Sequence, residues 1–225
     1  MAEHGDTRPF LGWHVLGAAF TAPVVSTAVT FAPFGVFVVP LMEAFDAPLK
    51  QLSLTLSVAF ALMMLMGPLV GYWLDRGLTR TLMLIGVSLS GLGLIGMSYA
   101  TSLLQVGALY CGAVAIGGAL FGIVPSMTLA TNWFDRRRGL ALGVTVAGAT
   151  AAAFVAPPAA TWPSERVGWR GALLYFGIAA LALGLPFLFL YALPRPEMAG
   201  HSLHAAPVPP AAEEGGSAAA PASWT

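Results

Sequence analysis

Residues 52–74, "LSLTLSVAFALMMLMGPLVGYWL", form a long apolar stretch that contains no charged side chain. The hydrocarbon core of a bilayer is about 30 Å thick, and about 20 apolar residues in a helix span it. The stretch exceeds that length, and its residues 59–74 do not alternate between apolar and polar side chains, which argues against a strand of a membrane barrel. It therefore predicts a transmembrane helix.

The composition of the whole chain agrees with this interpretation. Of its 225 residues, 57% are hydrophobic and only 9% are charged, and the mean hydropathy is +0.79. Soluble domains have about 25% charged residues, so an ordinary water-soluble protein is excluded. The formal net charge is zero, and Cys111 is the single cysteine. We therefore expect a partner in the lipid bilayer, and no nucleic acid, cofactor, disulfide framework or metal site.

Five further stretches have the same character. Asp and Glu lie outside them or at their edges, as expected when a charge at mid-bilayer costs about 3 kcal/mol or more. The six predicted spans are 13–42, 52–74, 81–99, 103–130, 140–162 and 172–193. They divide the chain into an N-terminal segment (1–11), an all-α transmembrane unit (12–194) and a disordered segment rich in Pro, Ala, Gly and Ser (195–225).

The basic residues predict the orientation of these spans. Most of them lie on one side, at Arg8, Arg76, Arg80, Arg136, Arg137, Arg138 and Arg195. The other side has Lys50, Arg166 and Arg170. By the positive-inside rule, we expect a multi-pass protein of the cell (inner or plasma) membrane with both termini in the cytoplasm. The arginines of the 135–138 turn then lie near anionic lipids, and a role as a plain membrane anchor remains open.

The spans also show a weak internal repeat. "GPLVGYWLDRG" (67–77) is similar to "APPAATWPSERVG" (156–168), close to 90 residues later. Phe34-Gly35 recurs as Phe121-Gly122, and Arg80 as Arg170, at nearly the same spacing. Because three spans separate equivalent helices, the two copies have opposite orientations. The sequence therefore predicts two inverted three-helix repeats.

Spans 1 and 4 are equivalent in this repeat, and both are interrupted by Pro and Gly. Such breaks at matching positions point to a substrate pathway, whereas close helix packing is the alternative explanation. The candidate cavity residues on these spans are Thr27, Thr30, Phe31, Phe34, Tyr110, Phe121 and Ser126. For each of them, helix packing is the competing interpretation.

Two loops carry a family resemblance. "GYWLDRGLTR" (71–80) resembles the loop between helices 2 and 3 of the major facilitator superfamily, although Gly77 comes one place early and only Arg80 is basic at the end. "NWFDRRRGLALGVTVAG" (132–148) resembles the helix 4 to 5 region of the monocarboxylate-transporter and oxalate/formate-antiporter branch. Together with other stretches, the likeness covers about residues 10 to 196.

The resemblance implies a fold and a mechanism. The fold is half of a major facilitator fold: six helices whose cytoplasmic loops act as a gate during alternating access. The implied gate residues are Gly71, Asp75, Arg76, Arg80, Asp135, Arg136, Arg137 and Arg138. Asp75 is expected to cap a neighbouring helix terminus and to pair with a basic residue, and the arginines to contact acidic groups or helix carboxyl ends.

The implied function is that of the amino-terminal half of a secondary active transporter. Its expected substrate is a small organic anion, a monocarboxylate or dicarboxylate, moved by proton symport or anion exchange. The expected partner is a second six-helix half with the basic binding residues, or a second copy of this chain. The alternatives are a fragment without transport activity and a half with a separately encoded partner. No GxSG or HExxH motif occurs in the chain, which argues against an intramembrane protease.

Overall fold

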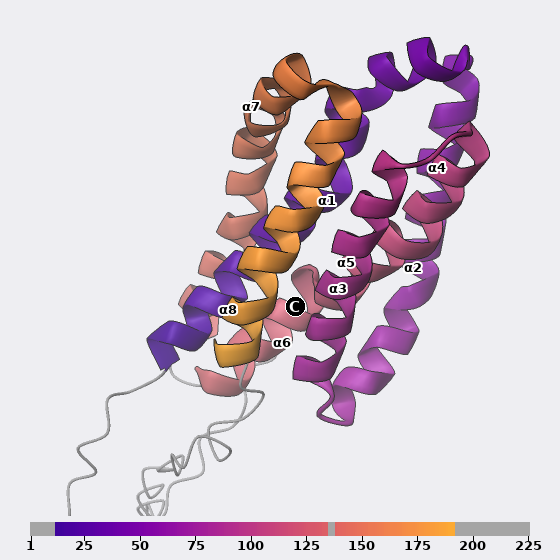
Figure 1. The fold of residues 1–225 in the computed structure, drawn as a ribbon. Helices are drawn as coiled ribbons and strands as arrows, with labels where there is room; N and C mark the ends of the chain where they lie inside the picture. Colours follow the sequence, from indigo (N-terminus) through magenta and orange to yellow (C-terminus); the bar gives the residue numbers. More distant parts are fainter. Residues whose placement is uncertain (1–11, 135–137, 192–225) are drawn as a thin grey trace, which may run out of the picture.

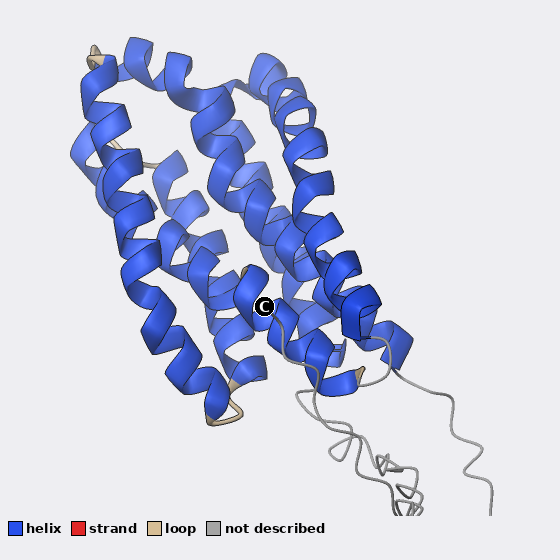
Figure 2. Ribbon diagram, turned by 180° about the vertical axis from the view of Figure 1, so that it is seen from behind, coloured by secondary structure: helices blue, strands red, loops and turns tan. Residues whose placement is uncertain are grey.

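The structure is a computed structural model that describes residues 12–134 and 138–191 (Figure 1). Within these ranges every regular element is a helix, and no strand occurs (Figure 2). The predictions for residues 1–11 and 195–225, and those for Asp135, Arg136 and Arg137, fall outside the described residues.

The first three helices are continuous and joined by short turns. They are α1 (Gly12–Phe45), α2 (Leu49–Asp75) and α3 (Thr79–Ser98). The turn between α2 and α3 contains Gly77 at φ 78°, in the left-handed region that glycine adopts without steric cost. This allows α3 to return directly beside α2.

The second part of the chain is less regular. A π-helical segment and a break at Gly122 divide the next crossing into α4 (Leu103–Leu109), η1 (Tyr110–Ala115), α5 (Ile116–Phe121) and α6 (Ile123–Trp133). The last elements are α7 (Arg138–Ala179), the π-helical η2 (Ala180–Gly184) and α8 (Leu185–Tyr191).

Five stretches in the described ranges are long and apolar enough to cross a membrane: Val15–Phe45, Leu49–Asp75, Thr79–Ser98, Leu103–Trp133 and Arg138–Leu190. The last has 53 residues and contains Gly168 with non-helical backbone, at φ 74° and ψ 170°. At this glycine the chain turns back, and the residues after it run beside residues 138–167 of the same element (Figure 1). We call residues 138–167 the first arm and residues 169–191 the second arm.

The boundary between these arms differs from the predicted one. The predicted spans leave a link over 163–171, whereas the structure continues both helices up to Gly168. Helix is maintained through Pro157 and Pro158, and the Thr161 hydroxyl donates to their carbonyl oxygens at 3.3 and 3.0 Å. Proline is tolerated within membrane helices, and one glycine at positive φ is sufficient for the turn.

Small residues hold the helices together around α3. A Cβ atom on Gly86 of α3 would lie 2.7 Å from the carbonyl oxygen of Gly117 in α5. Similarly, a Cβ atom on Gly177 of the second arm would lie 2.8 Å from the carbonyl oxygen of Gly91 in α3. Both are close backbone contacts of the type that small residues permit in membranes. They place α3 between α5 and the second arm.

Candidate functional site

A cavity of about 540 Å³ lies between α1, α2, the α5–α6 break and the first arm of α7. Ser26, Thr27 and Thr150 supply hydroxyl groups at its wall, and Phe31 and Met63 supply apolar surface. None of the described residues that line it is charged. The cavity is therefore a neutral, mainly apolar site with a few polar groups, which is the usual character of a small-molecule site.

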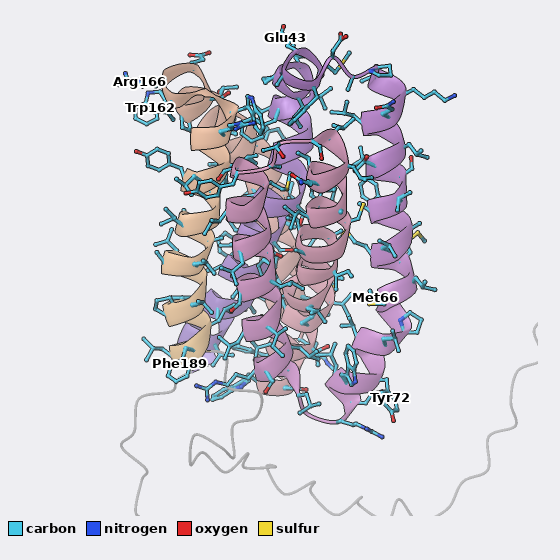
Figure 3. The ribbon with its side chains drawn as sticks, turned by 45° about the vertical axis from the view of Figure 1, so that its right-hand side comes forward. Glu43, Met66, Tyr72, Trp162, Arg166 and Phe189 are labelled. Carbon is cyan, nitrogen blue, oxygen red and sulfur yellow. The ribbon has the colours of Figure 1, made fainter. Side chains whose placement is uncertain are left out.

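A larger groove, of about 670 Å³, lies elsewhere, between the two arms of α7. Trp162 and Arg166 are among its lining residues, and the Arg166 guanidinium lies 4.6 Å from the centre of the Trp162 ring. Both residues lie at the end of the molecule that also bears Glu43, opposite Tyr72 and Phe189 (Figure 3). We favour the smaller cavity as the candidate site because four separate crossings enclose it.

The predicted cavity residues divide into two groups. Thr27 and Phe31 line the cavity, and Phe31 is 44% exposed. The other described residues of the prediction, Thr30, Tyr110, Phe121 and Ser126, are buried and do not line it. The side chain of Phe34 lies outside those that the structure describes.

The buried members bond between helices, bond within the fourth crossing or pack in the core instead. The Tyr110 hydroxyl of η1 donates to the Thr30 carbonyl oxygen of α1 at 2.7 Å. The Ser126 hydroxyl donates to the Gly122 carbonyl oxygen at 2.8 Å. Phe121 is fully buried in an apolar cluster. For these residues, the structure favours the packing interpretation.

Sequence reasoning missed the polar centre of the cavity. Ser26 donates through its hydroxyl to the Gly118 carbonyl oxygen at 3.2 Å and thus connects α1 to the segment before the helix break. Gly122 itself has φ −72° and ψ −149°, so α5 ends there and α6 begins at the next residue. The glycines and Pro125 of this segment were the available signal, but they did not indicate which side chains of α1 face them.

Three of the described gate residues, Asp75, Arg76 and Arg80, lie at or next to the ends of helices. Asp75 ends α2, Arg76 follows it, and the Arg76 guanidinium lies 4.1 Å from the centre of the Tyr72 ring. Arg80 of α3 donates to the Phe189 carbonyl oxygen of α8 at 2.6 Å. Tyr72 and Phe189 lie at the same end of the molecule (Figure 3).

Two other gate residues make no comparable contact. Gly71 lies within α2, and a Cβ atom there would meet no atom within 4 Å. Arg138 is the exposed first residue of α7. The capping role expected for Asp75 stays a prediction.

The helical architecture and the apolar crossings define a multi-pass membrane protein, and its described helices surround a neutral cavity. The family model of the Major Facilitator Superfamily matches residues 15–224, so the chain belongs to this superfamily.

Individual relatives agree with this assignment. Monocarboxylate transporter 13 of Bos taurus is 30% identical over 174 residues, which cover 77% of this chain and 40% of that protein. Monocarboxylate transporter 3 of Rattus norvegicus is 33% identical over 167 residues, covering 74% of this chain and 34% of the relative. Monocarboxylate transporter 7 of Homo sapiens is 29% identical over 175 residues, covering 76% and 32%. These relatives are transporters and not enzymes, and the chain spans less than half of their length.

Proposed function

We propose that this chain is the amino-terminal half of a secondary active transporter for a small organic anion. The neutral cavity between α1, α2, the α5–α6 break and the first arm of α7 is the observation that carries this proposal. Membership of the Major Facilitator Superfamily and the similarity to curated monocarboxylate transporters support it. By this similarity, the substrate is a monocarboxylate or dicarboxylate, moved by proton symport or anion exchange.

The proposal includes six spans arranged as two inverted three-helix repeats. The turn glycines Gly77 and Gly168 both have positive φ, and they occupy equivalent places in the sequence repeat. Arg80, near the start of α3, donates to the Phe189 carbonyl oxygen near the end of α8. Arg170, near the start of the second arm, donates to the Ala100 carbonyl oxygen just after α3, at 2.9 Å. This reciprocity supports the repeat, because a two-fold relation between inverted repeats exchanges these contacts.

The membrane orientation and the partner are also part of the proposal. The end with Arg76 and Arg80 lies on the cytoplasmic side of the cell membrane, as the positive-inside rule requires for the more basic side. A second six-helix half then completes the cavity and supplies the basic substrate-binding residues. A second copy of this chain is the alternative partner, and a six-helix fragment without transport activity is the alternative function.

Uptake into proteoliposomes tests the proposal. The chain is reconstituted alone and, separately, after co-expression with the carboxy-terminal half of a relative such as monocarboxylate transporter 13. Labelled pyruvate, lactate, formate and oxalate are supplied with a proton gradient or with counter-substrate inside the vesicles. We expect saturable uptake only when the second half is present. Uptake by the chain alone would assign the partner role to a second copy, and no uptake in either sample would favour the inactive fragment.

A further inference from the structure

The groove between the two arms of α7 has no role in the proposed function. It encloses about 670 Å³, and Arg166 is the one charged residue among the described residues that line it. Both arms contribute apolar and aromatic side chains to the rest of its wall, among them Trp162 and Phe176. Cavities of about 300–1,000 Å³ with mainly apolar walls and a few polar groups are typical binding sites for small molecules.

The guanidinium of Arg166 is held in place while its hydrogen-bond donors stay unused. It lies 4.6 Å from the centre of the Trp162 ring, one turn earlier on the same arm. Among the residues that the structure describes, it takes part in no hydrogen bond or ion pair, whereas Arg80 and Arg170 donate to carbonyl oxygens elsewhere in the fold. A guanidinium with free donors matches the oxygens of a phosphate, which it binds in a bidentate manner.

The wall changes in character along the length of the groove. Arg166 lies two residues before the turn at Gly168, at one end of the molecule, and Ala179 lies eleven residues after the turn (Figure 3). At 1.5 Å per residue, the groove extends from about 3 Å to about 16 Å from the turn, and half of the hydrocarbon core of a bilayer is about 15 Å thick. Trp162 and Tyr175 are 63% and 62% exposed, as is usual for the aromatic residues near a membrane surface. The groove therefore has a cationic end at the membrane surface and an apolar wall about one leaflet deep.

We propose that this groove binds one anionic phospholipid, whose phosphate contacts Arg166 and whose acyl chain lies along the second arm past Phe176 and Ala179. The wall selects this occupant because a single cation precedes an apolar surface, and because no carboxylate occurs among its described residues. Basic pockets between transmembrane helices bind lipid headgroups in this way. In the proposed orientation, the lipid belongs to the outer leaflet. The site is separate from the neutral cavity and does not depend on transport of an anion.

Lipid binding to the purified full chain in a mild detergent tests the phosphate contact. Native mass spectrometry gives the Kd of the first bound dioleoylphosphatidylglycerol. Arg166→Gln should raise this Kd about tenfold, as for one lost hydrogen bond to a charged group. Arg76→Gln is the matched control, because the Arg76 guanidinium lies 4.1 Å from the centre of the Tyr72 ring but does not line the groove. Its Kd should change less than about twofold.

Filling the groove tests the place of the acyl chain. Ala179→Phe adds a large side chain at an exposed position of the wall, so the lipid loses part of its apolar contact and its Kd should rise about tenfold. Ala61→Phe is the control, because Ala61 is an exposed alanine of α2 outside the groove. Circular dichroism checks that both variants keep their helicity. Dioleoylglycerol, which has the chains without the phosphate, should bind more weakly, and inorganic phosphate should not displace the lipid.

The other outcomes overturn the site and name its alternatives. No binding to the parent chain, or equal Kd values within either pair of variants, would contradict the groove as the lipid site. Equal affinity for dioleoylglycerol would contradict the phosphate contact, and displacement by inorganic phosphate would assign the groove to a soluble anion. A lipid-free dimer that Ala179→Phe separates would assign the groove to a second copy of the chain. Release of the lipid when the second half is added would assign it to that half.

Discussion

α2 and α3 follow each other in the chain and are both strongly apolar, with mean hydropathies of 2.0 and 1.7 in their most apolar windows. Yet 11% of that window is buried in α2, compared with 56% in α3. The glycines explain the difference. A Cβ atom added at Gly86 or Gly91 of α3 would meet the backbone or side chains of α5 and the second arm, whereas one added at Gly67 or Gly71 of α2 would meet no atom within 4 Å. Hydropathy thus places a helix in the bilayer, but small residues in contact determine its neighbours.

The same contrast separates two structural roles. α3 is the internal support of the unit, because it holds the fourth crossing and the second arm at backbone distance. α2 contributes Met63, Gly67 and Val70 to the cavity wall and leaves Met64 80% exposed and Leu65 68% exposed. In the proposed transporter, this exposed surface meets lipid or the second half.

The largest expected effect on stability comes from a glycine-to-alanine substitution in α3, compared with the same substitution in α2. In Gly86→Ala, the new Cβ atom would lie 2.7 Å from the Gly117 carbonyl oxygen, so the helices must separate. Overpacking of this kind destabilises by about 1–3 kcal/mol. Gly67→Ala has free space and removes a helix-interior glycine, so it is expected to be neutral or stabilising by up to about 1 kcal/mol. Thermal unfolding in detergent measures both. Equal melting temperatures of the two variants would contradict the proposed difference in packing between α2 and α3.

The next effect concerns how the two helices are anchored at the basic end. Arg80 connects α3 to α8 through the Phe189 carbonyl oxygen, whereas Arg76 stacks on Tyr72 in its own helix. Arg80→Gln should therefore destabilise by about 1 kcal/mol, as for one partly exposed hydrogen bond. Arg76→Gln, the control, should change stability by less than about 0.5 kcal/mol. Hydrogen exchange at the end of α8 should rise only in Arg80→Gln, and equal exchange in both variants would contradict the anchor.

The sharpest map of exposure comes from single cysteines. Cys111 is first replaced by alanine, because it is the single native thiol. Tyr72→Cys at the basic end of α2, where the native side chain is 51% exposed, should then react readily with a maleimide, whereas Met83→Cys on α3, where the native side chain is fully buried, should stay unlabelled in the folded protein (Figure 3). Protection of Tyr72→Cys in the chain alone would indicate that a second copy covers this end of α2. Protection only after the second half is added would support the proposed interface.

Sequence reasoning was successful where one physical rule dominates. Lipid cannot satisfy backbone hydrogen bonds, so long apolar stretches must become helices, and the all-helical character of the described residues follows from this. It was less successful at the link over 163–171, because helix continues on both sides of a one-residue turn at Gly168. It also could not separate Thr27 and Phe31, which line the cavity, from Tyr110 and Phe121, which are buried.

The physical reason lies in the solvent. In water, a polar face distinguishes the outside of a helix from its core, but in a bilayer the lipid-facing and the buried sides are both apolar. The sequence by itself therefore determined an all-helical membrane protein, the superfamily and the breaks of its fourth crossing. Only the tertiary structure decided that the break at Gly122 opens onto a neutral cavity beside Ser26 and Thr27, because that depends on which helix faces meet.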